Sequence, residues 1–179
     1  MKQRGASKEL TLSKLAKFLA RNHASESGLA RLAATGATTA EEAWERADDL
    51  DLIWAVTRPG VMSAKQRRYF LTEAVLSPIE SLLIDERSKN VLQKLRANEP
   101  ITVADRAASW MAIDAADETA WTWFAAYATA ETASSVATSD MAYAAYSAYS
   151  ATAWAMKAKQ TEQAGWLRRN FVFSDLSIE

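Results

Sequence analysis

The stretch that decides the fold is Ala104 to Ala158, ADRAASWMAIDAADETAWTWFAAYATAETASSVATSDMAYAAYSAYSATAWAMKA. Alanine occupies 21 of its 55 positions, and neither Gly nor Pro occurs in it. Because Ala is the best helix former and Gly and Pro are the worst, the stretch predicts helix. An alternating four-then-three spacing places mostly small side chains on one face, which lets another helix approach closely. The positions at this spacing are Ala116, Ala120, Trp123, Tyr127, Ala130, Ser134, Ala137, Met141, Ala144, Ala148, Ala151, Ala155 and Ala158.

A single helix over this stretch would be about 80 Å long at roughly 1.5 Å per residue, longer than a compact domain of this size. A break is therefore expected where side chains compete for backbone hydrogen bonds, and the stretch then folds back as an antiparallel pair. The in-phase spacing also fits one uninterrupted helix, and the same small face also suits a homodimer. The candidate break residues are Ser134, Ser135, Thr138, Ser139 and Asp140.

Short helices are predicted before this stretch, each from a residue that can cap its first turn. Two pairs have the spacing of a capping box, Thr39 with Glu42 and Thr102 with Asp105. In a capping box, the side chain of each residue accepts a hydrogen bond from the backbone N–H of the other. A first helix is expected from the apolar stripe that begins at Leu12. Single caps are expected at Ser25, Asp51, Ser63 and Asp85.

The sequence also indicates where these helices end. Gly36 suits a left-handed C-terminal position, and Arg58-Pro59-Gly60 predicts a turn. Pro78 removes a backbone donor, so Ser77 either ends its helix or marks a kink before Ile79. Because no segment alternates with the period of a strand, we expect an all-α chain. The predicted architecture is a compact helical bundle, with short N-terminal helices packed on long Ala-rich antiparallel C-terminal helices, in one domain over residues 1–179 with residues 1–9 flexible.

Composition restricts the class of protein. The chain has 179 residues, of which 49% are apolar, enough for one domain with a sizeable core. It has no Cys, so disulfides and thiolate chemistry are excluded and a reducing cytoplasmic setting is the simplest expectation. Lys14 and Lys17 interrupt the N-terminal apolar residues, and no apolar run approaches the roughly 18 residues of a membrane span.

No recognisable catalytic motif occurs in the sequence, which favours a protein that is not an enzyme and holds no cofactor or metal. The one histidine, His23, lies in a polar junction, and Asp114 with Glu118 is an ordinary pair of helix-surface acids. The glycines, at positions 5, 28, 36, 60 and 165, form neither a nucleophile elbow nor a phosphate-binding loop. A hydrolase remains an alternative that one sequence does not test.

Two groups of residues are candidates for binding another protein. The first is an acidic run on residues 41–51, and the second is a surplus of aromatic side chains, since the chain has seven Trp. Aromatic side chains are either core fillers or interface anchors, and acidic residues are mostly a solvated face. The predicted protein-binding residues are Glu41, Glu42, Glu45, Asp48, Trp121, Tyr143, Tyr146 and Tyr149.

Several segments taken together resemble a family of immunity proteins found in bacteria and phages. The resemblance covers roughly residues 38–171. It implies an all-helical protein that binds a toxin or another effector, and it transfers no catalytic or contact residue. The matching segments are AEEAW at Ala40 to Trp44, DLDLIWA at Asp49 to Ala55, RRYFLTEAVL at Arg67 to Leu76, LIDERSKNVL at Leu83 to Leu92, the Ala-rich stretch, and LRRNF at Leu167 to Phe171.

The sequence therefore predicts a cytoplasmic protein that binds and occludes a partner protein, in the manner of an immunity protein or a phage-encoded inhibitor. The alternative is a nucleic-acid-binding accessory protein. Residues 1–36 carry seven Lys/Arg against two acids, whereas residues 100–156 carry one against six, so the basic excess is confined to the N-terminus. The cations of that alternative are Lys2, Arg4, Lys8, Lys14, Lys17 and Arg21.

Overall fold

The computed structural model describes residues 12–22, 24–116, 121–158 and 163–171. Within these ranges the regular structure is helical, with ten α-helices and no strand, which confirms the all-α prediction. The elements are α1 (Leu12–Arg21), α2 (Glu26–Ala34), α3 (Ala40–Arg46), α4 (Asp49–Val56), α5 (Ala64–Phe70), the π-helical η1 (Leu71–Leu76), the 3-10 helix η2 (Ser77–Leu82), α6 (Glu86–Arg96), α7 (Val103–Asp114), α8 (Trp121–Ala137), α9 (Met141–Ala158) and α10 (Gln163–Asn170).

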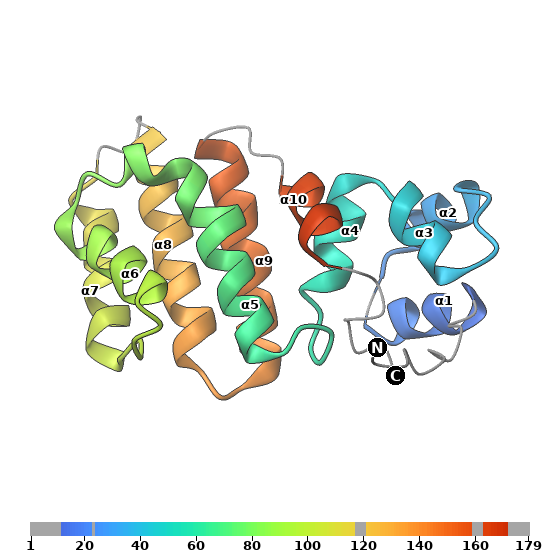
Figure 1. Ribbon diagram of the computed structural model, residues 1–179, viewed down its shortest axis with the longest axis horizontal. Coiled ribbons are helices and arrows are strands. Elements are labelled where there is room, and N and C mark those ends of the chain that lie inside the picture. The colour runs from blue at the N-terminus through green and yellow to red at the C-terminus, as the bar shows by residue number, and fades with distance from the viewer. Residues whose placement is uncertain (1–11, 23, 117–120, 159–162, 172–179) are drawn as a thin grey trace, which may run out of the picture.

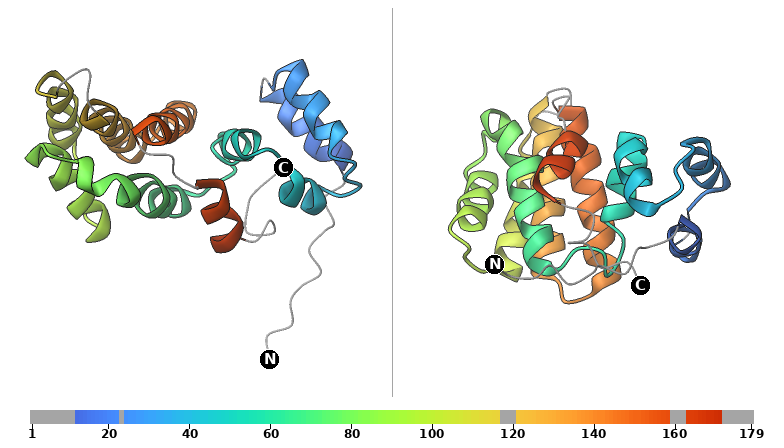
Figure 2. Two further views of the ribbon diagram at one scale, coloured as in Figure 1. Left: turned by 90° about the horizontal axis from the view of Figure 1, so that it is seen from above. Right: turned by 45° about the vertical axis from the view of Figure 1, so that its right-hand side comes forward.

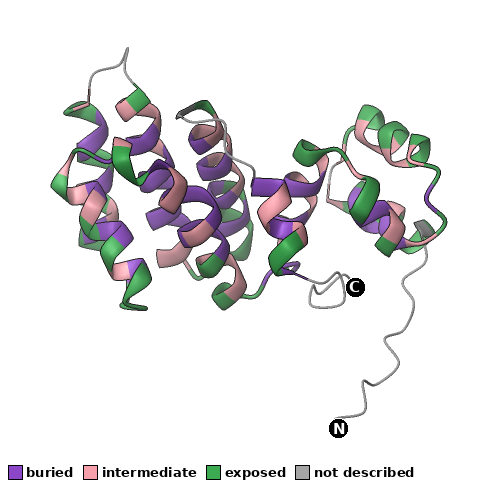
Figure 3. Cartoon of the chain, turned by 45° about the horizontal axis from the view of Figure 1, so that its top comes forward, coloured by how far each residue is buried: buried purple, intermediate pink, exposed green. Residues whose placement is uncertain are grey.

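The main body has two layers. Helices α7, α8 and α9 form one row, and α5, η1, η2 and α6 lie across one side of it (Figures 1 and 2). Figure 3 shows that the buried residues line the facing sides of these helices. The long antiparallel C-terminal helices are therefore present as predicted. Ala148 and Ala151 of α9 are fully buried, and Ser135 Oγ of α8 donates to the carbonyl of Ala144 across the pair at 2.7 Å.

The break in the Ala-rich stretch falls in the Ser/Thr-rich segment. Helix α8 ends at Ala137 and α9 begins at Met141, so the folded-back pair is confirmed and the uninterrupted helix is wrong. Asp140 caps α9, since its Oδ1 accepts hydrogen bonds from the backbone N–H groups of Ala142 and Tyr143 at 2.9 and 3.1 Å. A second break, which the sequence did not predict, separates α7, ending at Asp114, from α8.

The four-then-three series of small residues forms a buried face in α9 from Ala144 to Ala155, and only in part in α8. In α9, Ala144, Ala148, Ala151 and Ala155 are completely buried. In α8 the series is mixed, because Ala130 and Ser134 are completely buried whereas Trp123 and Tyr127 are half-buried. The prediction of one continuous face is wrong because the chain turns between the helices, and the turn breaks the angular register of the series.

Most helix starts are those expected from capping residues. The capping box of Thr102 and Asp105 is complete, and Thr39 Oγ1 accepts from the backbone N–H of Glu42 at 3.1 Å. The Glu42 carboxylate accepts instead from the N–H of Thr38 at 2.7 Å, one residue before the expected position. Asp51 is not a cap, because α4 begins at Asp49 and Asp48 caps it.

The segment around Pro78 is kinked rather than terminated. Helix α5 continues into the π-helical η1 and then the 3-10 helix η2, which has Pro78 in its first turn. The first turn of a helix does not use its backbone N–H groups in intrahelical hydrogen bonds, so the missing N–H of proline costs little there. The change from π-helical to 3-10 hydrogen bonding makes room for the proline ring. Phe70 and Ile79, on either side of the kink, are fully buried in the core.

The N-terminal helices α1, α2 and α3 pack with α4 beside the two layers, and α4 and α10 connect them to the main body (Figure 1). Arg168 on α10 pairs with Asp49 at 2.9 Å and donates to the carbonyl of Ala47 at 2.7 Å, fixing α10 against the start of α4. No helix in the described ranges has both the length and the apolar character needed to cross a membrane. The predicted flexibility of residues 1–9 concerns a segment outside the described residues.

Candidate protein-binding surfaces

The α7–α8–α9 layer has one side that faces away from α5 and α6, and no described helix lies over that side (Figure 2, left). A group of aromatic residues runs across these three helices, and its central rings, Trp123, Tyr127 and Trp154, are half-buried. On α9, the helical period of about 100° per residue places Tyr143, Tyr146 and Trp154 on one face. We call the whole set the outer aromatic face. Its residues are Trp110 on α7, Trp123 and Tyr127 on α8, and Tyr143, Tyr146 and Trp154 on α9.

The rings at the centre of this face hold one another in place. The Tyr127 ring centroid lies 4.5 Å from that of Trp123 and 4.8 Å from that of Trp154. The Trp123 and Trp154 rings meet edge to face at 89°, with centroids 5.5 Å apart. Trp110 meets Tyr127 at 5.9 Å, also edge to face. These are favoured geometries of aromatic pairs, so the rings stabilise one another.

Two hydrogen bonds anchor the face to the helices beneath it. Trp110 Nε1 donates to the hydroxyl of the buried Ser134 at 3.2 Å, which joins α7 to α8. Ser150 Oγ on α9 donates to Glu131 Oε1 on α8 at 3.0 Å. Burial raises the pKa of Glu131 above its ordinary value, an effect that the hydrogen bond from Ser150 opposes.

The segment that carries this face contains acidic residues but no basic ones between its two ends. No Lys or Arg occurs between Arg106 and Lys157. Lys157 already lies over the Trp154 ring, with Nζ 4.5 Å from its centroid. Asp114 and Asp140, at the ends of α7 and α9, are exposed. Lys157 is therefore the cation that this stretch brings to a ring, and residues 107–156 supply none.

The structure places the predicted aromatic residues at three different locations. Tyr143 and Tyr146 are 41% and 64% exposed and belong to the outer aromatic face. Tyr149 is half-buried and faces α4, where the Arg58 guanidinium lies 5.7 Å from its ring. Trp121 is 60% exposed at the start of α8, and its ring contacts Phe124, which in turn packs on Trp123 and Trp154.

The predicted acidic residues form a separate surface on α3 and the start of α4. Glu41, Glu45 and Asp48 are exposed, and Glu42 is half-buried because it binds Thr38. Helix α3 lies on the far side of α4 from α9 (Figure 1). The acidic run and the aromatic residues are therefore not one surface.

Sequence reasoning missed Trp110, Trp123, Tyr127 and Trp154 as parts of one surface. The spacing of Tyr146 and Trp154, eight residues apart, is the one local signal, because it keeps both on the same side of α9. The pairing of α8 with α7 and α9, which brings the other rings beside them, has no local signal.

The described residues offer little basis for other chemistry. They contain no group of three or more acidic or histidine side chains able to hold a metal ion. Several candidate residues of the sequence lie outside the described residues, namely His23, Glu118, Lys2, Arg4 and Lys8. Lys14 and Arg21 on α1 are exposed. Comparison of the chain with models of protein families, with curated proteins and with solved structures finds no match.

Proposed function

We propose that this protein binds another protein through the outer aromatic face and acts by covering a surface that the partner needs. The observation that supports the proposal is the cluster of half-buried rings around Tyr127, together with the exposed Tyr143, Tyr146 and Trp110. Tyr and Trp are the residues most enriched at the energetic centres of protein interfaces. The resemblance to immunity proteins supports the same class, an immunity protein or a phage-encoded inhibitor that occludes a toxin or host effector.

The partner surface should carry Lys or Arg side chains. A guanidinium or ammonium group stacks favourably on the face of Trp or Tyr, and the segment between Arg106 and Lys157 supplies no cation of its own. Exposed Asp114 and Asp140 add negative charge at the edges, which favours encounter with a basic surface. Nucleic acid fits this face less well, because stacked bases need neighbouring Lys or Arg for the phosphates.

The test begins with affinity capture from the native host, which identifies the partner, and continues with the purified pair. The variant is Tyr143→Ala/Tyr146→Ala, and the matched control is Leu50→Ala/Ile84→Ala, which removes exposed apolar side chains elsewhere. We expect the tyrosine variant to weaken binding at least about tenfold and the control to bind normally, since truncating an interface anchor costs about 2 kcal/mol.

Three results would contradict the proposal. Equal affinities of the native protein and the tyrosine variant would remove the aromatic face from the interface. A loss of binding in Glu41→Lys/Glu45→Lys, with the tyrosine variant unaffected, would place the interface on α3. Capture of nucleic acid, with binding that falls steeply as salt is added, would favour the accessory-protein alternative.

A further inference from the structure

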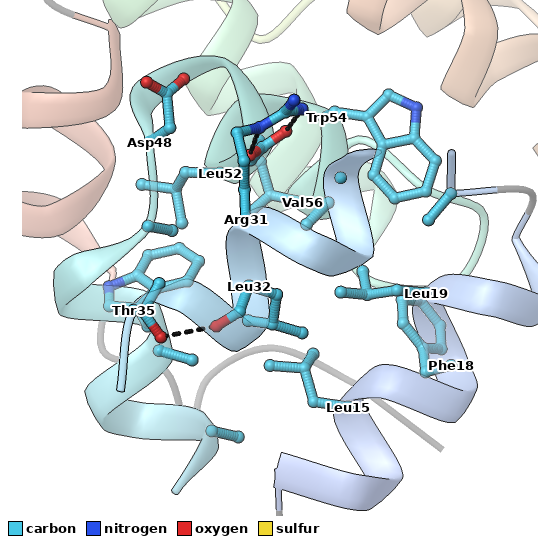
Figure 4. A pocket seen from close by; sticks show the side chains of 18 of the residues that line it. Leu15, Phe18, Leu19, Arg31, Leu32, Thr35, Asp48, Leu52, Trp54 and Val56 are labelled. Carbon is cyan, nitrogen blue, oxygen red and sulfur yellow. Dashed lines mark hydrogen bonds and ion pairs between the residues drawn. The ribbon is translucent and has the colours of Figure 1, made fainter. Parts of the chain in front are cut away.

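An apolar cavity lies between α1, α2, α3 and α4, away from the outer aromatic face (Figure 4). Its volume is about 80 Å³. The side chains around it come from all four helices and are mostly aliphatic or aromatic. They include Leu15, Phe18, Leu32, Trp44, Leu52 and Trp54.

Helix α2 closes the cavity loosely. None of its residues is buried, and Leu32, which lines the cavity, remains half-buried. Across the cavity, Leu15 and Leu52 are buried in the core. Apolar cavities that lack hydrogen-bonding partners stay dry and accept small apolar ligands. The interior therefore suits a hydrocarbon group.

Polar groups at the edge of the cavity are almost all paired. Arg31 holds Asp51 through two hydrogen bonds of 2.6 Å, from Nε and from a terminal nitrogen. The Thr35 hydroxyl donates to the carbonyl of Leu32 at 2.7 Å. Arg31, Asp51 and Thr35 therefore already have hydrogen-bond partners within the protein.

Asp48 is the exception at this edge. Its Oδ1 accepts from the backbone N–H of Leu50 at 2.9 Å, and no ion pair in the described part of the chain includes it. It lines the cavity on the same side as the Arg31–Asp51 pair (Figure 4). Arg31 and Asp51 neutralise each other, so Asp48 leaves this edge with a net negative charge.

We propose that the α1–α4 cavity is a binding site for a small amine that carries a hydrocarbon chain. The chain occupies the space between Leu32 and Leu52, and the ammonium group lies at the edge beside Asp48. A chain that ends in a carboxylate is disfavoured, because Asp48 and Asp51 repel it. The site is separate from the outer aromatic face, so it stands or falls independently of the proposed function.

The test compares three probes of equal chain length, hexylamine, hexanol and hexanoate, by calorimetric titration of the full chain. We expect hexylamine to bind about threefold to fivefold more tightly than hexanol, the range typical of a solvent-exposed charge pair, and hexanoate to bind most weakly. Asp48→Asn should remove the advantage of hexylamine over hexanol. Asp140→Asn is the matched control, since Asp140 caps α9 as Asp48 caps α4, and it should leave the advantage intact.

A second variant tests the cavity itself. Ala55, a half-buried residue of α4, lines the cavity, and Ala55→Leu should weaken all three probes together by filling it. Equal binding of hexylamine and hexanoate would overturn the proposal, as would the absence of hexylamine binding. Unchanged preference for hexylamine in Asp48→Asn would also overturn it, and that comparison stands even if Ala55→Leu fails to fold.

Discussion

Glu131 on α8 is buried against Ser150 on α9, with Ser150 Oγ donating to Glu131 Oε1 at 3.0 Å and only 8% of Glu131 exposed. No cation pairs with this carboxylate among the ion pairs of the described residues. Burial disfavours the charged form and raises the pKa of Glu131. A carboxyl group whose ionised form is disfavoured by burial thus lies between α8 and α9.

This burial gives stability an unusual pH dependence. Because the pKa of Glu131 is raised in the folded state, the folded chain binds its proton more tightly, and the contribution of Glu131 to stability falls as pH rises above about 4.5. Glu131→Gln keeps the hydrogen bond and removes the charge, so its unfolding free energy relative to the native protein should increase from pH 4 to pH 7. Urea titrations at both pH values measure it, with the exposed Glu99→Gln as control. A pH-independent difference would contradict burial of the ionised group.

Asp105 on α7 gives the opposite dependence. Its pairing with Lys94 at 2.7 Å and its bonds to Thr102 lower the pKa of Asp105 to about 2. A lowered pKa stabilises the fold above the ordinary value of 3.8 and loses that contribution as pH falls towards 2. Asp105→Asn should therefore cost about 1 to 2 kcal/mol at pH 6, with screening by solvent included, and the cost should shrink towards pH 2. Asp114→Asn on the same helix is the control, and an equal cost at both pH values would refute the pairing.

The contact between α8 and α9 depends on small side chains. Ala148 is fully buried in it, whereas Ala142, six residues earlier on α9, is exposed. We expect Ala148→Leu to destabilise the protein by about 1 to 3 kcal/mol through overpacking, and Ala142→Leu to change stability by less than about 0.5 kcal/mol. Chemical denaturation of both variants measures this. Similar stabilities would show that the two helices do not approach closely at Ala148.

The indole of Trp110 contributes to the free energy of unfolding through a hydrogen bond as well as through its packing. Its Nε1 group satisfies the hydroxyl of Ser134, which is completely buried. Trp110→Phe should cost about 1 kcal/mol, because the lost hydrogen bond leaves a buried polar group unpaired. Trp121→Phe, at an exposed position on α8, should cost less than about 0.5 kcal/mol. If both substitutions proved equally mild, the bond between α7 and α8 would be unimportant.

Local features of the fold were predictable because a helix start is a short-range event. Thr102 with Asp105, Ser63 and Asp85 all cap helices where the sequence indicated. The error at Asp51 has the same origin, since Asp48 lies three residues earlier in an acidic run and competes for the same role.

The candidate surfaces were predictable only in part. The exposure of Tyr143 and Tyr146 follows from their position on α9, but Tyr149 is turned towards Arg58 by the packing of α4, which is a long-range contact. The juxtaposition of Trp110, Tyr127 and Trp154 depends on the order of α7, α8 and α9 in one layer. Helical periodicity assigns a face within one helix and says nothing of the neighbours beside it.

The most direct test of the proposed function is oxidative footprinting of the protein with and without its captured partner. The account predicts that Tyr143, Tyr146 and Trp110, which are exposed in the free chain, become protected in the complex. Tyr69, 49% exposed on α5 in the other layer, serves as the internal reference and should change little. Unchanged oxidation of Tyr143, Tyr146 and Trp110, with protection appearing on α3 instead, would contradict the assignment of the interface to the outer aromatic face.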